Sequence, residues 1–192
     1  PNDVNAHPHS APDGKLAIIH NGIIENYSVI KEELKQRGYI FTSDTDTEVL
    51  AYLMQDIREH EKTDFAETVR LALSQVTGAY AIVVISQDDP DMLVAARKGS
   101  PLVVGIGEGE FFFASDAAPI VDHTRQVVYP GEEEIVVVSL KEGLKIMTIG
   151  KTEKTPYIQT LELNLTALEK GGFPHFMLKE INEQPRTVRD SM

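Results

Sequence analysis

The sequence of 192 residues contains no cysteine and no tryptophan, and it is poor in basic residues. Without cysteine, these residues can form no disulfide bond, no thiolate metal site and no thiol redox centre. The 18 Lys and Arg residues are outnumbered by 30 Asp and Glu residues, which gives a formal net charge of −12. A chain this acidic is not expected to bind nucleic acid or an anionic membrane through a basic face.

Long hydrophobic runs are also missing from the sequence. Apolar runs such as 81–85 and 135–138 are far shorter than the roughly 20 residues that a membrane-spanning helix needs. The first residues, Pro1–Val4, lack the basic and then apolar layout of a signal peptide. We therefore expect a cytoplasmic protein with no membrane partner, and the overall composition is that of a globular domain.

Helical patterns fill the first half of the chain after one short strand. The β-branched run Lys15–His20 predicts a strand that ends in a tight turn at Asn21 and Gly22. Three residues are predicted to cap the helices that follow, namely Asn26, Thr45 and Asp64. Thr45 and Glu48 fit a capping box, in which each side chain satisfies a free amide of the first turn.

After Gly78 the pattern changes to short β-branched runs separated by Gly, Pro, Asp and Glu. Seven strands are predicted in this half, at 79–86, 92–97, 102–106, 111–114, 126–129, 134–140 and 144–149. Their short connections favour antiparallel pairing, and runs that are apolar on both faces indicate sheets covered on both sides. The residue pattern therefore predicts a layered α+β domain.

The dipeptide Asn21-Gly22 and the residue Asp46 are candidates for a role in catalysis or ligand binding. A strand that stops at Asn21 and Gly22 places a side-chain amide beside an unhindered backbone N–H, as in an oxyanion hole, although a plain Asn-Gly turn explains the same dipeptide. Asp46 lies in a first helical turn, where the helix dipole favours an ionised carboxylate that could bind a substrate ammonium, although Asp is common there. His7 and His9 flank a proline without a third ligand at fixed spacing, which indicates a turn rather than a metal site. No nucleophile follows from the pattern.

Six segments, taken together and in order, resemble one family. They are Asn-Ala-His-Pro-His at 5–9, His-Asn-Gly-Ile-Ile-Glu-Asn at 20–26, Thr-Asp-Thr-Glu-Val at 45–49, and the segments 93–102, 113–116 and 175–185. They are similar to the glutamine amidotransferases with an N-terminal nucleophile, and within these to the glutaminase domain of the glutamine–fructose-6-phosphate aminotransferases. The resemblance implies the four-layer αββα sandwich of N-terminal-nucleophile hydrolases, with two mainly antiparallel sheets face to face.

The resemblance also implies a reaction and a set of site residues. In this family an N-terminal cysteine attacks the side-chain amide of L-glutamine, giving glutamate and ammonia. Asn21 and Gly22 match the oxyanion hole, Asp46 matches the carboxylate that binds the substrate ammonium, and His7 matches a histidine that lines the pocket. The ammonia is channelled to fructose 6-phosphate on a sugar-isomerase domain, forming glucosamine 6-phosphate. No metal and no cofactor are implied, and the parent enzyme is expected to be a homo-oligomer.

The sequence departs from the family pattern at both ends. The cysteine, the strands after it, an Arg-Trp-x-Thr-His segment and the isomerase domain are absent from the 192 residues. We therefore expect 1–160 to be the C-terminal two-thirds of a glutaminase domain that lacks its N-terminal strands, and 161–192 to be a helical connector toward the isomerase domain. Such a fragment should be inactive alone, and its uncovered edges should favour self-association.

Two alternatives stay open. An amidotransferase of the amidophosphoribosyltransferase type shares the cysteine chemistry and a His-Asn-Gly element, but passes ammonia to a phosphoribosyl acceptor. The continuation Ile23–Asn26, the segment 97–102 and the connector favour the sugar-phosphate branch instead. The other alternative is a catalytically dead module that keeps the pocket and binds glutamine.

Overall fold

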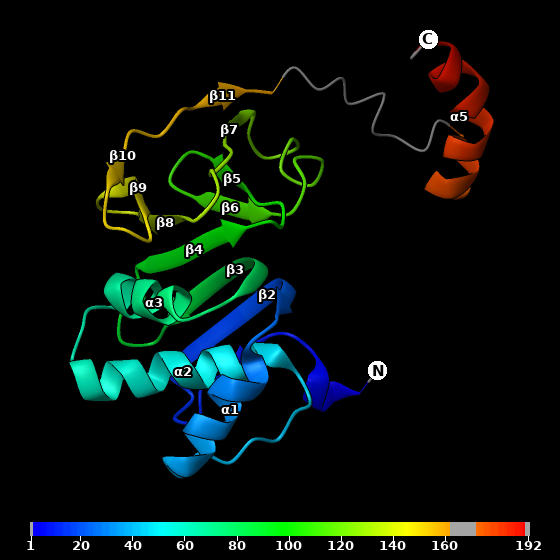
Figure 1. The fold of residues 1–192 in the computed structure, drawn as a ribbon. Coiled ribbons are helices and arrows are strands. Elements are labelled where there is room, and N and C mark those ends of the chain that lie inside the picture. Colours follow the sequence, from blue (N-terminus) through cyan, green and yellow to red (C-terminus); the bar gives the residue numbers. More distant parts are fainter. Residues whose placement is uncertain (1, 162–171, 191–192) are drawn as a thin grey trace.

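The computed structural model describes residues 2–161 and 172–190, and the ribbon in Figure 1 shows two sheets and a layer of helices. The helices are η1 (Asp3–Asn5), α1 (Tyr27–Gln36), α2 (Asp46–Glu61), α3 (Phe65–Ser74) and α5 (Phe176–Asp190). The larger sheet has the strand order β1 (His9–Ser10), β2 (Leu16–Ile24), β3 (Gly78–Ser86), β4 (Met92–Lys98), β8 (Glu134–Ser139), β9 (Gly143–Thr148) and β10 (Glu153–Lys154). The smaller sheet has the order β11 (Gln159–Thr160), β7 (Gln126–Val128), β5 (Val103–Ile106) and β6 (Phe111–Ala114).

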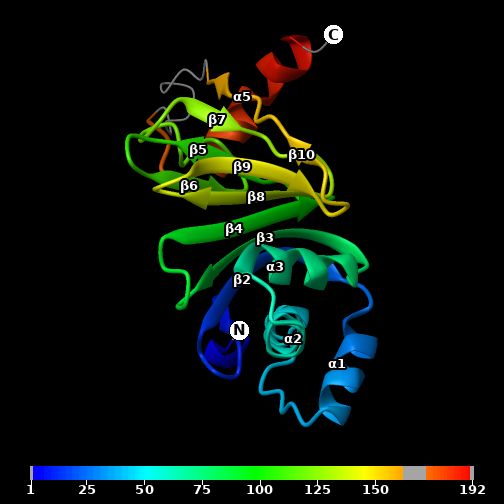
Figure 2. The same cartoon turned by 90° about the vertical axis from the view of Figure 1, so that its left-hand side faces the viewer.

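All pairings between these strands are antiparallel, and the α+β class predicted from the residue pattern is confirmed. Figures 1 and 2 show α1, α2 and α3 stacked on one face of the larger sheet. Ile135 and Val137 of β8 belong to the core under these helices. Val136 and Val138 pack against Val104 of the smaller sheet, on the opposite face. The alternation along one strand thus joins the two halves of the core.

The smaller sheet leaves part of the larger one open. On the face of β2 and β3 that is turned away from the helices, Ile19, Ile23 and Ile85 are exposed, at 46%, 68% and 50%, whereas Ala81 is buried. This open face lies beside the residues that the sequence singled out for chemistry. The candidate site is therefore at the border of a covered and an uncovered part of the sheet.

The strand β2 does not end at Asn21 and Gly22, as the sequence predicted, but continues to Ile24. Gly22 pairs with Tyr80 of β3 and has a φ of 137°, and a Cβ at this position would lie 2.1 Å from the Ala79 carbonyl oxygen. A tight hairpin turn of the Asn-Gly type needs both residues at positive φ, and of these two only Gly22 has it. The dipeptide therefore marks a close approach of two strands rather than a turn.

The capping predictions have mixed outcomes. Asp64 caps α3 by accepting a hydrogen bond from the N–H of Glu67 at 2.8 Å, as predicted. Asn26 is the N-cap residue of α1, as predicted, but its side chain makes no capping bond and instead binds the end of α3. Its Nδ2 donates to the Gln75 carbonyl at 2.8 Å and its Oδ1 accepts from the Thr77 N–H at 2.9 Å. Asn26 thus joins the helical layer to β3 instead of closing a first turn.

Only half of the predicted capping box forms at the start of α2. The Thr45 hydroxyl accepts a hydrogen bond from the Glu48 N–H at 3.2 Å. The Glu48 carboxylate does not return to Thr45 and accepts four hydrogen bonds from the N–H and hydroxyl groups of Thr42 and Ser43, at 2.8 to 2.9 Å. A buried carboxylate therefore fixes the loop that leads into α2.

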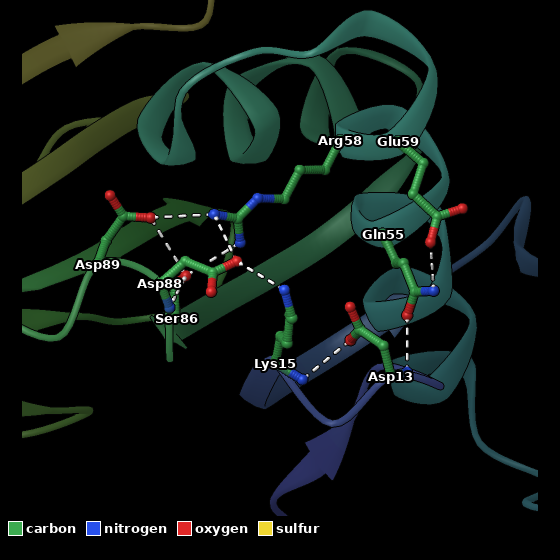
Figure 3. A network of polar contacts seen from close by, with 8 residues as sticks. All are labelled: Asp13, Lys15, Gln55, Arg58, Glu59, Ser86, Asp88 and Asp89. Carbon is green, nitrogen blue, oxygen red and sulfur yellow. Dashed lines mark hydrogen bonds and ion pairs between the residues drawn. The ribbon is translucent and has the colours of Figure 1, made fainter.

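A polar network fixes the other end of α2 to the sheet (Figure 3). Arg58 donates to the Ser86 hydroxyl at 3.0 Å and lies 3.2 Å from the Asp89 carboxylate and 3.3 Å from that of Asp88. The Lys15 ammonium also lies 3.3 Å from Asp88. One guanidinium thus joins the helix to the turn between β3 and β4.

Replacing Arg58 by alanine should lower the free energy of unfolding by about 1–2 kcal/mol, because Ser86 is buried and would lose a charged donor. Urea denaturation measures the change. Lys15→Ala is the matched control, since that side chain is 48% exposed and forms one ion pair, and its loss should cost less than about 0.5 kcal/mol. Equal losses in the two variants would contradict the anchoring role of Arg58.

The helix α5 lies apart from the two sheets in Figure 1 and contains Pro185. Residues 162–171 of the predicted connector lie outside the described part of the chain, so the boundary near residue 160 stays a prediction. Among the described residues, no helix is both long and apolar enough to cross a membrane.

Candidate functional site

A pocket of about 220 Å³ lies between β2 and the smaller sheet. His7, His20 and Asn21 form part of its wall, together with the apolar side chains of Leu102 and Phe113. A larger cavity of about 310 Å³ lies among α1, α2 and α3, and none of the predicted site residues lines it. The smaller pocket is the candidate site because His7 and Asn21 line it, whereas Gly22 and Asp46 are not among its lining residues.

Asn21 and Gly22 lie on β2 where one edge of the strand is free. β1 pairs with β2 only as far as Ile18, and no other described strand continues along this edge. The N–H of Ile24 points to the free edge, since it donates to the Asp46 carboxylate. Backbone N–H groups two residues apart on a strand point to the same side, so the N–H of Gly22 also points to the free edge. The Asn21 side chain lines the pocket, so an amide and a backbone N–H lie next to each other at an open border.

Asp46 is the first residue of α2 and is held against β2. Its Oδ2 accepts a hydrogen bond from the Ile24 N–H at 2.7 Å, and its side chain is 22% exposed. Its Oδ1 lies 3.5 Å from the Thr47 hydroxyl and 3.9 Å from Nδ1 of His20. One carboxylate oxygen therefore fixes the helix to the strand, while the other faces a cluster of polar groups.

His7 and His9 do not share one partner. Nε2 of His7 lies 3.3 Å from the Thr47 hydroxyl, and Nε2 of His9 lies 3.2 Å from the Thr45 hydroxyl. The two rings meet edge to face, with centroids 5.5 Å apart. In the described residues no group of three His, Asp or Glu side chains is arranged to hold a metal ion. The site consists of hydroxyl, imidazole, amide and carboxylate groups.

The structure adds His20 and Thr47, which the sequence did not single out. Both are buried, at 5% and 2% exposure, and Nδ1 of His20 lies 3.0 Å from the Thr47 hydroxyl. Burial lowers the pKa of His20, although the nearby Asp46 charge raises it, so the ring is neutral at pH 7. The sequence feature that could have identified His20 is its position in β2, where it lies on the same buried face of the strand as Ile18 and Ile24.

Comparison with known proteins gives the family of the chain. Residues 2–122 match the family described as the glutamine amidotransferase domain. Over its whole length the chain is 53% identical to the glutamine–fructose-6-phosphate aminotransferases (isomerizing) of Bacteroides thetaiotaomicron and Chlorobaculum tepidum. The corresponding protein of Pyrococcus horikoshii is 45% identical. The chain spans 31% of the length of the first two relatives.

Solved structures give the same fold. The glutamine phosphoribosylpyrophosphate amidotransferase of B. subtilis superposes with a TM-score of 0.65 at 25% identity, over 77% of this chain and 32% of that one. An allosteric regulatory enzyme of purine biosynthesis has a TM-score of 0.63 at 24% identity, over 76% of this chain and 31% of that one. The two-sheet fold implied by the resemblance is thus confirmed, and with a family match over most of its residues the chain belongs to the glutamine amidotransferase domain family.

Proposed function

We propose that the chain is the larger part of the glutaminase domain of a glutamine–fructose-6-phosphate aminotransferase. The observation that carries this proposal is the 53% identity over the whole chain to two such enzymes, against 25% to the structurally similar phosphoribosylpyrophosphate amidotransferase. The parent enzyme would hydrolyse L-glutamine and transfer the ammonia to fructose 6-phosphate, making glucosamine 6-phosphate. Because the chain spans 31% of those relatives, the sugar-phosphate chemistry would belong to residues beyond these 192.

The pocket supports a division of roles for the glutamine step. The side-chain amide of Asn21 and the N–H of Gly22 are neighbouring donors at the free edge of β2, suited to the oxyanion that forms when the amide carbon is attacked. Oδ1 of Asp46 would accept the substrate α-ammonium, and His7 would complete the wall. The thiol would come from outside the 192 residues, which contain no cysteine.

The same proposal divides the chain into residues 1–160 of the glutaminase domain and a connector at 161–192. The exposed apolar side chains on α5, among them Met177, Ile181 and Val188, are compatible with a segment that packs on another domain. We further expect the parent enzyme to be a homo-oligomer.

The 192-residue chain alone should release no glutamate from L-glutamine. The chemistry needs a nucleophile that these residues lack, because none of them is cysteine. A coupled glutamate assay with a protein-free blank measures the release, and the full-length enzyme of a relative serves as the positive control. Release above the blank would contradict the assignment of the thiol to residues outside the chain.

Replacing Asp46 by asparagine should weaken the binding of L-glutamine by about 10-fold to 150-fold, since a charge-assisted contact of about 1.5–3 kcal/mol would be lost. The asparagine side chain keeps an acceptor for the Ile24 N–H, so the fold should persist. Calorimetric titration measures the affinity. Asp44→Asn is the control, because it removes the same charge from an exposed side chain two residues earlier. An unchanged affinity in Asp46→Asn would exclude this carboxylate from the site.

A further inference from the structure

We propose that Thr47 is a positioning residue of this pocket, whose buried hydroxyl fixes the His7 ring and the Asp46 carboxylate relative to each other. The ligand in this inference rests on the proposed function, whereas the arrangement of the side chains is tested independently of it.

Three groups meet at the Thr47 hydroxyl oxygen. Nδ1 of His20 lies 3.0 Å from it, Nε2 of His7 lies 3.3 Å from it, and Oδ1 of Asp46 lies 3.5 Å from it. They come from three segments: the stretch before β1, the strand β2 and the start of α2. Thr47 is 2% exposed, so its hydroxyl is shielded from bulk water. One oxygen atom thus connects His7 and His20, which line the pocket, with the carboxylate of Asp46.

The proton count restricts how the three contacts are made. A hydroxyl donates one hydrogen bond and accepts two, and an ionised carboxylate can only accept. All three contacts are satisfied together only when Thr47 donates to Asp46 and accepts from both rings. His7 then carries its proton on Nε2, and His20 carries its proton on Nδ1.

The surroundings of His20 support this assignment. Its Nε2 is buried and has no hydrogen-bond partner. A buried acceptor without a partner is tolerated more readily than a buried N–H without one, which favours a lone pair on Nε2. The Ala79 carbonyl raises the pKa of the ring as a hydrogen-bond acceptor, and the lowering effect of burial is larger. In the assignment that satisfies all three contacts at Thr47, the neutral ring donates through Nδ1 to the hydroxyl.

The tautomer of His7 determines whether this ring offers a ligand a hydrogen-bond donor or an acceptor. In the tautomer that carries its proton on Nε2, His7 donates to Thr47 and has an acceptor lone pair at Nδ1. Oδ1 of Asp46, which accepts from the same hydroxyl but does not belong to a residue that lines the pocket, is a second acceptor nearby. The pair suits the ammonium group of glutamine and does not suit its carboxylate.

The test is a long-range ¹H–¹⁵N NMR spectrum of the 192-residue chain at mildly alkaline pH, which distinguishes the two neutral tautomers of each histidine. His7→Gln and His20→Gln variants assign the signals. We expect His20 to be protonated on Nδ1 and His7 on Nε2. A proton on Nε2 of His20 would overturn the proposal, because Thr47 would then donate to His20 and not to Asp46.

Variants of Thr47 separate positioning from simple burial. Thr47→Val keeps the shape but removes the hydroxyl, and it should shift the ring signals of His7 and His20 and weaken glutamine binding about fivefold, whereas Thr47→Ser should keep both properties. Thr68→Val is the matched control, since Thr68 is fully buried in α3 with a hydroxyl bonded to the Asp64 carbonyl. It should lower stability and leave the histidine signals unchanged.

The outcomes keep the two proposals distinct. Ring signals that stay unchanged in Thr47→Val would overturn the role of Thr47, and so would an unchanged glutamine affinity in that variant. If the unmodified chain binds no glutamine while the tautomers are as expected, the ligand assignment fails and the positioning of His7 and Asp46 by Thr47 stands.

Discussion

Replacing Glu48 by alanine should lower the free energy of unfolding by about 3–4 kcal/mol, one of the two largest effects expected of a single side chain here. Glu48 is 3% exposed, and its carboxylate accepts four hydrogen bonds from Thr42 and Ser43. A hydrogen bond to a charged group contributes about 1.5–3 kcal/mol, but contributions within one network do not add. Removing the carboxylate would leave the donors of a buried loop without an acceptor.

The effect should depend on the acceptor and not on volume alone. Glu48→Gln keeps the size and one acceptor oxygen, so it should cost about half as much as the alanine variant. Glu32→Ala is the control on α1, because the Glu32 side chain is 65% exposed and pairs with Lys35, and its loss should cost less than about 0.5 kcal/mol. Urea denaturation measures all three variants. Similar losses in Glu48→Ala and Glu32→Ala would refute the role of the buried carboxylate.

The pH dependence of the Glu48 contribution has a definite sign. Burial raises the pKa of this carboxyl, but the hydrogen bonds from Thr42 and Ser43 together outweigh burial and hold the pKa below its ordinary value. A carboxyl whose pKa is lower in the folded state stabilises the fold above its unfolded pKa of about 4.3 and loses this contribution as the pH falls through the folded value. The stability difference between the unmodified chain and Glu48→Ala should therefore be constant near neutral pH and shrink in acid.

Much of the fold could be predicted because the strand pattern is local. The predicted strand at 111–114 coincides with β6, and the run predicted at 134–140 forms β8 at Glu134–Ser139. In β8 the alternation also reflects the two layers, since Ile135 faces the helices and Val136 faces the smaller sheet. Where the residues of a strand determine which face is buried, the sequence alone is sufficient to predict the strand.

The errors occur where a distant partner replaces a local one. Asn21 and Gly22 form a turn signal when read locally, but β3 pairs with β2 through both residues and continues the strand. Glu48 has the spacing of a capping box, yet Thr42 and Ser43 in the preceding loop provide better donors. Which strand pairs with these residues, or which group donates to Glu48, depends on tertiary packing and cannot be predicted from the spacing of residues in the sequence.

In the candidate site, too, some residues could be predicted from the sequence and others could not. Residue type and resemblance were enough to propose Asn21 and Asp46, because an amide or carboxylate at the end of an element is conspicuous. His20 and Thr47 were missed because each lies in the buried phase of its own element, where a polar residue looks like part of the core. Their relation becomes visible only when β2 and α2 are packed together, at 3.0 Å between Nδ1 and Oγ1.

Replacing Gly22 by alanine should lower the free energy of unfolding by about 3–5 kcal/mol, because a strained backbone and a backbone clash coincide. At a φ of 137° an L-residue is strained, and the new Cβ would lie 2.1 Å from the Ala79 carbonyl oxygen and 2.9 Å from Cα of Tyr80. Both atoms belong to the backbone of β3, so no side-chain rotation relieves the contact. The strands would have to separate.

Gly14→Ala separates the clash from the strain. Gly14 has a φ of 73°, and no atom lies within 4 Å of the position that a Cβ would occupy there, so alanine should cost only about 1 kcal/mol. Separation of β2 from β3 should also speed amide exchange at Ala81 and Val83, whose N–H groups point to β2, and Gly14→Ala should leave these amides protected. In Gly22→Ala, the separation of the strands would also move the Gly22 N–H and the Ile24 N–H that holds Asp46. The affinity for glutamine should therefore fall by more than the loss of stability explains. Equal denaturation midpoints for the two alanine variants would show that β3 accommodates a side chain at Gly22, and the close approach would then not be what requires glycine.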